Sequence, residues 1–218
     1  MGLTVAALEA IAGWLPGSRV LSLGYPDLVV PAAEVRRILG VEVTRFTEFG
    51  SWHRAPFPLP ETLAVFEAIG ATLDCVDSSP SRGVERVVDL NLPCELGSYD
   101  VVIDAGTVEH CFSVGQAILN AANAVAAGGC VFHMPPLSKV NHGFYNLNPT
   151  LLFDFYAQNG WDVELLEGVA GGRRFALSPT ARFTPPPEAS LLFIASRREV
   201  APLRMPVQSK YLSNPGLR

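Results

Sequence analysis

Short apolar runs alternate with helical patterns along most of the chain. The residues in these runs predict strands at Arg19–Leu23, Thr72–Asp77, Arg86–Asp89, Tyr99–Asp104, Cys130–Met134, Trp161–Leu166 and Ser190–Ser196. Apolar spacing and turn residues predict helices between them, over Pro31–Leu39, Thr62–Ile69, Val114–Val125 and Leu151–Gln158. Strands that alternate with helices are typical of a parallel sheet with crossover helices.

Two segments interrupt this pattern. Residues 41–60 hold Trp52-His53-Arg54 and three prolines, and residues 167–187 hold glycine and arginine pairs and three consecutive prolines. We expect both to be insertions that form binding loops, lids or mobile surface. No helical pattern separates the last two predicted strands.

The length fits one domain, which we predict over residues 1–199. An extended tail that contains prolines is predicted to follow it at residues 200–218.

The composition favours a globular protein with a sizeable core. Of the 218 residues, 49% are hydrophobic and 17% are charged. The net charge of −5 argues against nonspecific binding to nucleic acid or to an anionic membrane. No apolar run is long enough to span a membrane, and residues 1–14 lack a basic signal region. We expect a soluble cytoplasmic protein. The sequence does not decide whether it forms a homo-oligomer.

The cysteines and histidines do not predict a metal centre. The four cysteines contain no C-x-x-C pair, and two of them lie in or beside apolar strand-like runs. The four histidines, His53, His110, His133 and His142, match no ligand spacing of a helix or hairpin. We therefore expect neither a disulfide framework nor a bound metal ion.

Acidic side chains recur where predicted strands end. Asp77, Asp89 and Asp104 each close an apolar run, and Asp27 follows the first strand in a proline turn. Ligands of open α/β sheets bind outside the carboxyl ends of the strands, so these carboxylates mark the expected site. The sequence has no G-x-G-x-x-G loop, which argues against a nicotinamide or flavin enzyme.

From about Arg19 to Arg197, the order of these elements resembles the Rossmann-like (class I) S-adenosylmethionine-dependent methyltransferases. The resemblance rests on seven strands whose last two are consecutive, and on ordered positions along them. It implies an α/β fold with a doubly wound, mostly parallel seven-stranded sheet and an antiparallel last strand. It also implies S-adenosylmethionine as the cofactor.

The resemblance assigns cofactor contacts to the strand ends. Gly24 stands in the turn after the first strand, where the family's backbone passes close to the methionine part of the cofactor. Ser22 replaces the family's acidic residue there, and Asp27 either takes over the contact with the ammonium group or only caps its turn. Asp77 would accept hydrogen bonds from the ribose hydroxyls, or cap the following turn.

Further contacts follow along the same edge. In the family, an Asp and the next backbone N–H bind the adenine ring, which here points to Asp89 and Leu90. Asp104 and Ala105 would face the methionine end of the cofactor and the acceptor. Glu109-His110 matches a pair that is frequent in small-molecule methyltransferases, where it is not always catalytic.

The acceptor side is predicted from the loop after the fifth strand. His133, His142, Tyr145 and Asn146 lie there and would orient an acceptor, or else only satisfy the loop's own backbone. Trp52 is a further candidate for acceptor binding. Histidine suits a general base near neutral pH, so we predict His142 as the base for an oxygen acceptor, with His110 in reserve.

These observations favour methyl transfer to a small molecule or sugar. In-line transfer from a sulfonium has a neutral leaving group and needs mainly alignment, which explains the lack of a strong catalytic motif. Two alternatives stay open. One is a methyltransferase-like binding or assembly protein that has lost the cofactor, and the other is a different α/β enzyme, such as one acting on nucleotide sugars.

Overall fold

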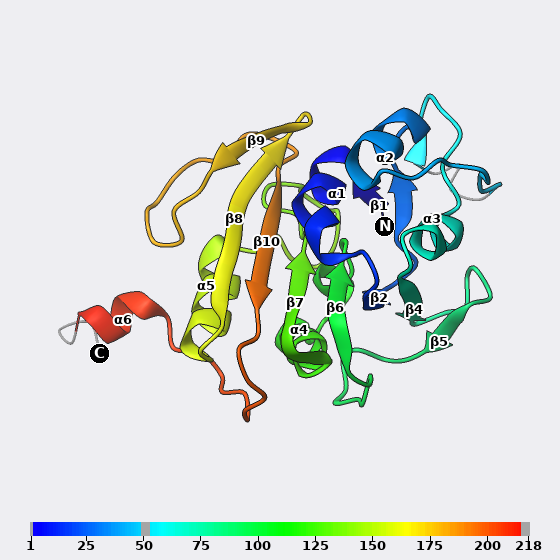
Figure 1. Ribbon diagram of the computed structural model, residues 1–218. Coiled ribbons are helices and arrows are strands. Elements are labelled where there is room, and N and C mark those ends of the chain that lie inside the picture. Colours follow the sequence, from blue (N-terminus) through cyan, green and yellow to red (C-terminus); the bar gives the residue numbers. More distant parts are fainter. Residues whose placement is uncertain (1, 49–52, 215–218) are drawn as a thin grey trace.

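The computed structural model describes residues 2–48 and 53–214. Within these residues the main sheet has eight strands in the order β5-β4-β2-β6-β7-β10-β8-β9 (Figure 1). The bounds of these strands, in chain order, are β2 Arg19–Leu23, β4 Thr72–Asp77, β5 Glu85–Val87, β6 Tyr99–Asp104, β7 Val125–His133, β8 Asp162–Ala170, β9 Arg173–Ala176 and β10 Ser190–Ser196.

The strand directions confirm the predicted fold class. The strands from β5 to β7 run parallel, whereas β10 pairs antiparallel with both β7 and β8. The last strand in the chain is thus inserted between β7 and β8, the antiparallel arrangement that the sequence resemblance implied. All seven predicted strands are present, and β2, β4, β6 and β10 have the predicted bounds.

Helices cover both faces of the sheet. Their bounds are α1 Val5–Ile11, α2 Ala32–Leu39, α3 Thr62–Ala68, α4 Val114–Asn123, α5 Pro149–Gln158 and α6 Ser209–Ser213, with 3₁₀ turns at Ala12–Trp14 and Val108–His110. Buried residues of α4 and α5 belong to one hydrophobic cluster, and buried residues of α1, α2 and α3 belong to a second. The four helices predicted from the sequence, α2 to α5, are confirmed.

The central strands are apolar on both faces because each face is covered. Along β6, Val102 packs in the cluster of α4 and α5, while Val101 and Ile103 pack in the cluster of α1 to α3. Successive side chains of a strand point to opposite faces, so a strand between two helical layers needs a continuous apolar run. This explains why the apolar runs could be recognised as central strands.

Several short elements depart from the sequence-based expectations. Strands β1 (Gly2–Thr4) and β3 (Asp27–Val29) form a separate parallel pair, and α1 follows β1. The predicted insertion at 167–187 contains the end of β8 and the hairpin strand β9. The tail at 200–218 was expected to be extended, but residues 209–213 form α6.

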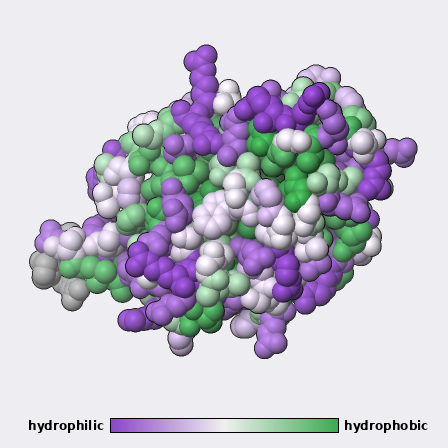
Figure 2. All heavy atoms as spheres, viewed as in Figure 1, coloured by the Kyte–Doolittle hydropathy of each residue, from purple (hydrophilic) through white to green (hydrophobic). Residues whose placement is uncertain are grey.

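Hydrophilic residues are spread over the visible face, with smaller apolar areas between them (Figure 2). Within the described residues, no helix is long and apolar enough to cross a membrane.

Candidate functional site

A cavity of about 420 Å³ opens beside the carboxyl ends of β4, β5 and β6. We call it the strand-end cavity. Its lining residues are Asp77, Ser78, Val88, Asp89, Leu90, Asn91, Gly106, Thr107, His110 and Cys111. A volume in this range is typical of pockets for small molecules and cofactors. The structure thus places four predicted site residues, Asp77, Asp89, Leu90 and His110, around one cavity.

Two carboxylates enter this cavity from successive strands. Asp77 is partly exposed, and one of its oxygens accepts hydrogen bonds from the Ser78 hydroxyl at 3.2 Å and the Ser79 N–H at 3.3 Å. Asp89 accepts from the side chain and backbone of Asn91 at 2.8 and 2.9 Å, and these bonds lower the pKa of its carboxyl group. Both serines donate to the same oxygen of Asp77, Oδ1. The other oxygen, Oδ2, receives neither of these bonds and can accept a hydrogen bond from a ligand.

The turn after β2 begins at Gly24. Its φ of 78° lies in the left-handed region, which glycine adopts without steric cost, and its N–H donates to the carbonyl of Val76 at 2.6 Å. This bond ties the turn to the end of β4. Ser22, at the position that is acidic in the family, is buried, and its hydroxyl has no hydrogen-bond partner.

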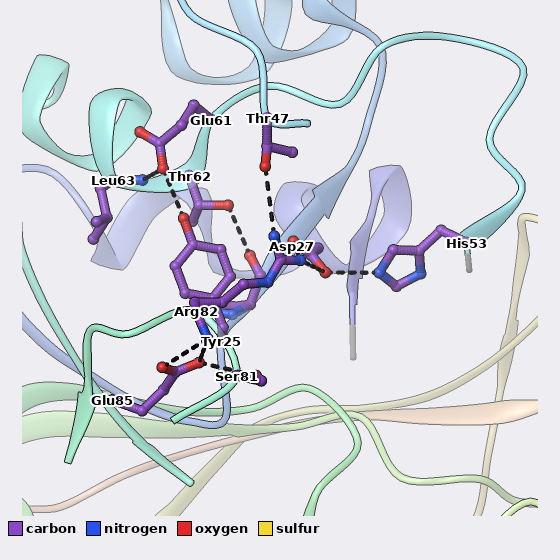
Figure 3. Close-up of polar contacts among 11 residues, drawn as sticks. Tyr25, Asp27, Thr47, His53, Glu61, Thr62, Leu63, Ser81, Arg82 and Glu85 are labelled. Atoms are coloured by element: carbon purple, nitrogen blue, oxygen red, sulfur yellow. Dashed lines mark hydrogen bonds and ion pairs between the residues drawn. The ribbon is translucent and has the colours of Figure 1, made fainter. Parts of the chain in front are cut away.

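Asp27 is the centre of a buried ion-pair network (Figure 3). Arg82 Nη2 donates to both of its carboxylate oxygens, at 2.5 and 2.7 Å, and His53 Nε2 lies 2.9 Å from one of them. The Asp27 side chain is only 2% exposed. This carboxylate is therefore held by Arg82 and His53, and the geometry gives no support to the predicted contact with a cofactor ammonium group.

The same network fixes the Tyr25-Pro26 segment against α3 (Figure 3). The Tyr25 hydroxyl donates to Glu61 at 2.7 Å, and the Thr62 hydroxyl donates to the Pro26 carbonyl at 3.1 Å. The Arg82 guanidinium also lies over the Tyr25 ring, 4.9 Å from its centroid. A bulky, well-anchored turn thus follows Gly24.

Asp104 belongs to a buried hydrogen-bond chain at the ends of β6 and β7. One oxygen accepts from the backbone N–H groups of Thr107 and Val108, at 2.8 and 3.2 Å, and the other lies 2.7 Å from His133 Nδ1. His133 Nε2 lies 2.7 Å from the Tyr156 hydroxyl. Every atom in the chain has a partner if His133 carries its proton on Nδ1 and accepts from Tyr156.

This chain changes the interpretation of two predicted site residues. Asp104 and His133 are both 0% exposed, and their polar atoms are committed to protein partners. Asp104 is the last residue of β6 and His133 the last residue of β7, so their contact joins the ends of the two strands. The expectations that Asp104 contacts the cofactor and that His133 contacts the acceptor gain no support from this placement.

A second cavity, of about 300 Å³, adjoins the first, and the two share Gly106 and His110. We call it the histidine cavity. It is lined by Gly2, Thr4, His53, Ala105, Gly106, Glu109, His110, Met134, Pro136, Lys139, His142 and Ser190. His110 and His142, the two predicted catalytic residues, therefore lie on the same cavity.

Glu109 brings these two histidines together. Its Oε1 lies 3.5 Å from His142 Nε2 and 4.0 Å from His110 Nε2. Burial, followed by the charge of Asp104, raises the pKa of Glu109 to about 8. Burial also lowers the pKa of both histidines, so their imidazoles are neutral at neutral pH.

The loop that carries His142 packs directly on Glu109. The Phe144 N–H donates to the Glu109 carbonyl at 2.9 Å, and a Cβ added at Gly143 would lie 2.9 Å from that carbonyl oxygen. A glycine is needed here because a side chain would push the two segments apart.

We expect Gly143→Ala to destabilise the protein by about 1–3 kcal/mol, the usual cost of overpacking, because the contact is with backbone. Gly115→Ala is the matched control. Gly115 lies in α4 with nothing within 4 Å of an added Cβ, so alanine there should stabilise the helix by up to about 1 kcal/mol. Urea unfolding of both variants checks this, and equal effects would contradict the close packing of the loop.

The remaining predicted residues have other placements. Ala105 is buried and lines the histidine cavity. The Tyr145 hydroxyl donates to the Phe112 carbonyl at 2.9 Å, and the Asn146 side chain accepts from the Lys139 N–H at 2.8 Å, so both stabilise the loop. Trp52 lies outside the described residues.

Three residues of the site were not predicted from the sequence. Arg82 and Tyr156 come from segments remote from their partners Asp27 and His133, and Glu109 was noted only as a neighbour of His110. No local pattern marks these pairs, because each forms only when separate elements meet.

Comparisons with known proteins agree with the fold. No protein-family model and no curated protein matches the chain. TehB from Haemophilus influenzae matches in structure with a TM-score of 0.55 and 11% identity, over 88% of this chain and 62% of that chain. TrmN from Thermus thermophilus has a TM-score of 0.45 and 16% identity, over 88% of this chain and 48% of that chain.

A third match is the 1,6-didemethyltoxoflavin-N1-methyltransferase from Burkholderia thailandensis, solved with 1,6-didemethyltoxoflavin and S-adenosylhomocysteine. It has a TM-score of 0.45 and 13% identity, over 89% of this chain and 76% of that chain. The aligned region is less than two thirds of the TehB and TrmN chains. Together with the strand order, the match to TehB confirms the methyltransferase-like Rossmann fold.

Proposed function

We propose that this protein is an S-adenosylmethionine-dependent methyltransferase that acts on a small molecule or sugar. The observation that carries the proposal is the strand-end cavity, which has Asp77 and Asp89 at the ends of two neighbouring strands. Carboxylates in this position suit a ligand with a ribose diol and an exocyclic amine, since both present hydrogen-bond donors.

The residues of the strand-end cavity fit the parts of such a cofactor. Asp77 would accept from the ribose hydroxyls, while Asp89 and the backbone at Leu90 would take the adenine ring. Gly106 and His110, which the two cavities share, mark the side on which the methyl group would lie. The cofactor supplies an electrophilic methyl group on a sulfonium, and its transfer leaves a neutral thioether.

The histidine cavity is the proposed acceptor site. Holding the acceptor there aligns its nucleophilic atom with the methyl group, and alignment is the largest contribution the protein makes to an in-line displacement. His142 and His110 remain the residues that deal with the proton of an acceptor hydroxyl, because both imidazoles are neutral and face this cavity.

Calorimetric titration with S-adenosylmethionine and S-adenosylhomocysteine tests the proposal. We expect one site per chain, with a dissociation constant in the range of about 1 µM to 1 mM that is usual for enzyme ligands. Adenosine alone should bind more weakly, since it lacks the methionine part. Absence of binding by both compounds would contradict the enzyme assignment.

One observation favours a second candidate, a binding protein of the same fold without transferase activity. The turn after β2 is filled by Tyr25 and Pro26, and Asp27 is neutralised by Arg82 (Figure 3). If that turn excludes the methionine part of the cofactor, adenosine and S-adenosylhomocysteine would bind equally well. The same titrations therefore separate the two candidates.

A further inference from the structure

Glu109 is a buried carboxylate without a hydrogen-bond partner. It is 0% exposed, and neither of its oxygens has a hydrogen bond with any described residue. A buried carboxyl group without a hydrogen-bond partner is costly, so its presence in a folded protein calls for an explanation, and a bound ion is one. Glu109 is one of the residues that line the histidine cavity, where the Nε2 atoms of His110 and His142 both lie within 4.0 Å of Oε1.

These three groups have the spacing of a metal site. One ligand atom from each of Glu109, His110 and His142 lies within 4.8 Å of the other two. Ligands about 2.0–2.1 Å from a tetrahedral metal ion are about 3.4 Å apart. The separations from Glu109 Oε1, 3.5 and 4.0 Å, are close to this value, and the side chains would draw together around a bound ion.

We propose that Glu109, His110 and His142 bind a divalent first-row metal ion, with Zn²⁺ the best match. Two imidazoles and one carboxylate form a donor set that suits zinc and its neighbours better than magnesium or calcium. Three protein ligands leave a coordination position for water or substrate, as in catalytic zinc sites. This position faces the histidine cavity, which all three ligands line.

Charges of both signs act on Glu109. The carboxylate of Asp104 raises its pKa, and the ammonium of Lys139, which also lines the histidine cavity, lowers it. The backbone is also preorganised, because the Phe144 N–H and the side-chain-free Gly143 hold the His142 loop against Glu109.

The role of the ion, but not its binding, rests on the proposed function. An acceptor hydroxyl at the open position would be polarised by the ion and lose its proton more readily. His110 and His142 would then hold the ion as ligands, and neither would act as a free base. The new C–O bond forms as the S–C bond breaks, and the proton leaves to solvent water.

The test is a titration of the untagged, chelator-treated protein with Zn²⁺ and Co²⁺. We expect one equivalent to bind, and Co²⁺ to give visible d–d absorption without a thiolate charge-transfer band. Glu109→Gln and His142→Ala should each weaken binding more than about 100-fold, beyond the effect of an outer-shell change. His53→Ala is the matched control, because His53 lines the same cavity but contacts Asp27.

Two results would overturn the proposal. One is the absence of a stoichiometric ion in the wild-type protein, and the other is equal affinity in the wild type and Glu109→Gln. Circular dichroism melting of each variant shows whether it is folded. If a variant does not fold, the Co²⁺ spectrum of the wild-type protein still tests whether the ion binds. S-Adenosylhomocysteine binding in chelator distinguishes the two claims, since it should persist when the metal is removed.

Discussion

Replacing Asp104 with alanine is expected to destabilise the protein by about 3–5 kcal/mol, the cost of leaving a buried polar network without its charged member. The change would leave His133 Nδ1 and the N–H groups of Thr107 and Val108 without their acceptor. For a protein of this size, each kcal/mol lowers the melting temperature by about 2–4 °C. Urea unfolding and thermal melting measure both quantities.

Asp100→Ala is the matched control for this prediction. Asp100 lies on the same strand, β6, but it is exposed and accepts one hydrogen bond, from the Arg19 N–H at 2.8 Å. We expect a loss of at most about 1 kcal/mol. Tyr156→Phe should fall between the two, at about 1–3 kcal/mol, because it leaves only His133 Nε2 without a partner. Equal effects of Asp104→Ala and Asp100→Ala would contradict the buried chain.

Asp77→Ala is expected to weaken the binding of S-adenosylhomocysteine about ten- to hundredfold. Hydrogen bonds to a charged group contribute about 1.5–3 kcal/mol, and each 1.4 kcal/mol changes affinity about tenfold. Asp77 ends β4 at the strand-end cavity, and its local partners are only Ser78 and Ser79. The fold should therefore tolerate the change, and calorimetry of the folded variant measures the loss of binding.

The control for this variant comes from the same strand. Asp74 is exposed, accepts from the Tyr99 hydroxyl at 2.9 Å and does not line the strand-end cavity. Asp74→Ala should bind S-adenosylhomocysteine as the wild type does. If Asp77→Ala also retains full affinity, the ribose is not held at the end of β4.

Central strands of the fold were predictable because they are buried on both sides. The runs that became β2, β6 and β10 are mostly buried and long enough to show a pattern without tertiary information. The three-residue strands β1 and β3 are too short to carry such a pattern. The hairpin of β8 and β9 has a recognisable turn, Gly171-Gly172, but it lies among prolines and arginines that are typical of an insertion.

The only site residues that could be predicted from the sequence are those at the carboxyl ends of the parallel strands. Asp77 and Asp89 reach one cavity because parallel strands bring their carboxyl ends to the same edge. The partners of Asp27 and Asp104 are long-range, so the sequence did not reveal that Arg82 and His133 occupy these carboxylates. Electrostatic pairing across the fold decides which acidic side chains remain open to a ligand.

A crystal structure of the protein with S-adenosylhomocysteine is the most direct test of the central claim. The proposed function predicts the ribose hydroxyls on Asp77, the adenine beside Asp89 and Leu90, and the sulfur atom near Gly106 and His110. Density at another cavity, such as the one lined by Tyr25 and Phe46, would contradict it. So would an unoccupied strand-end cavity at saturating ligand.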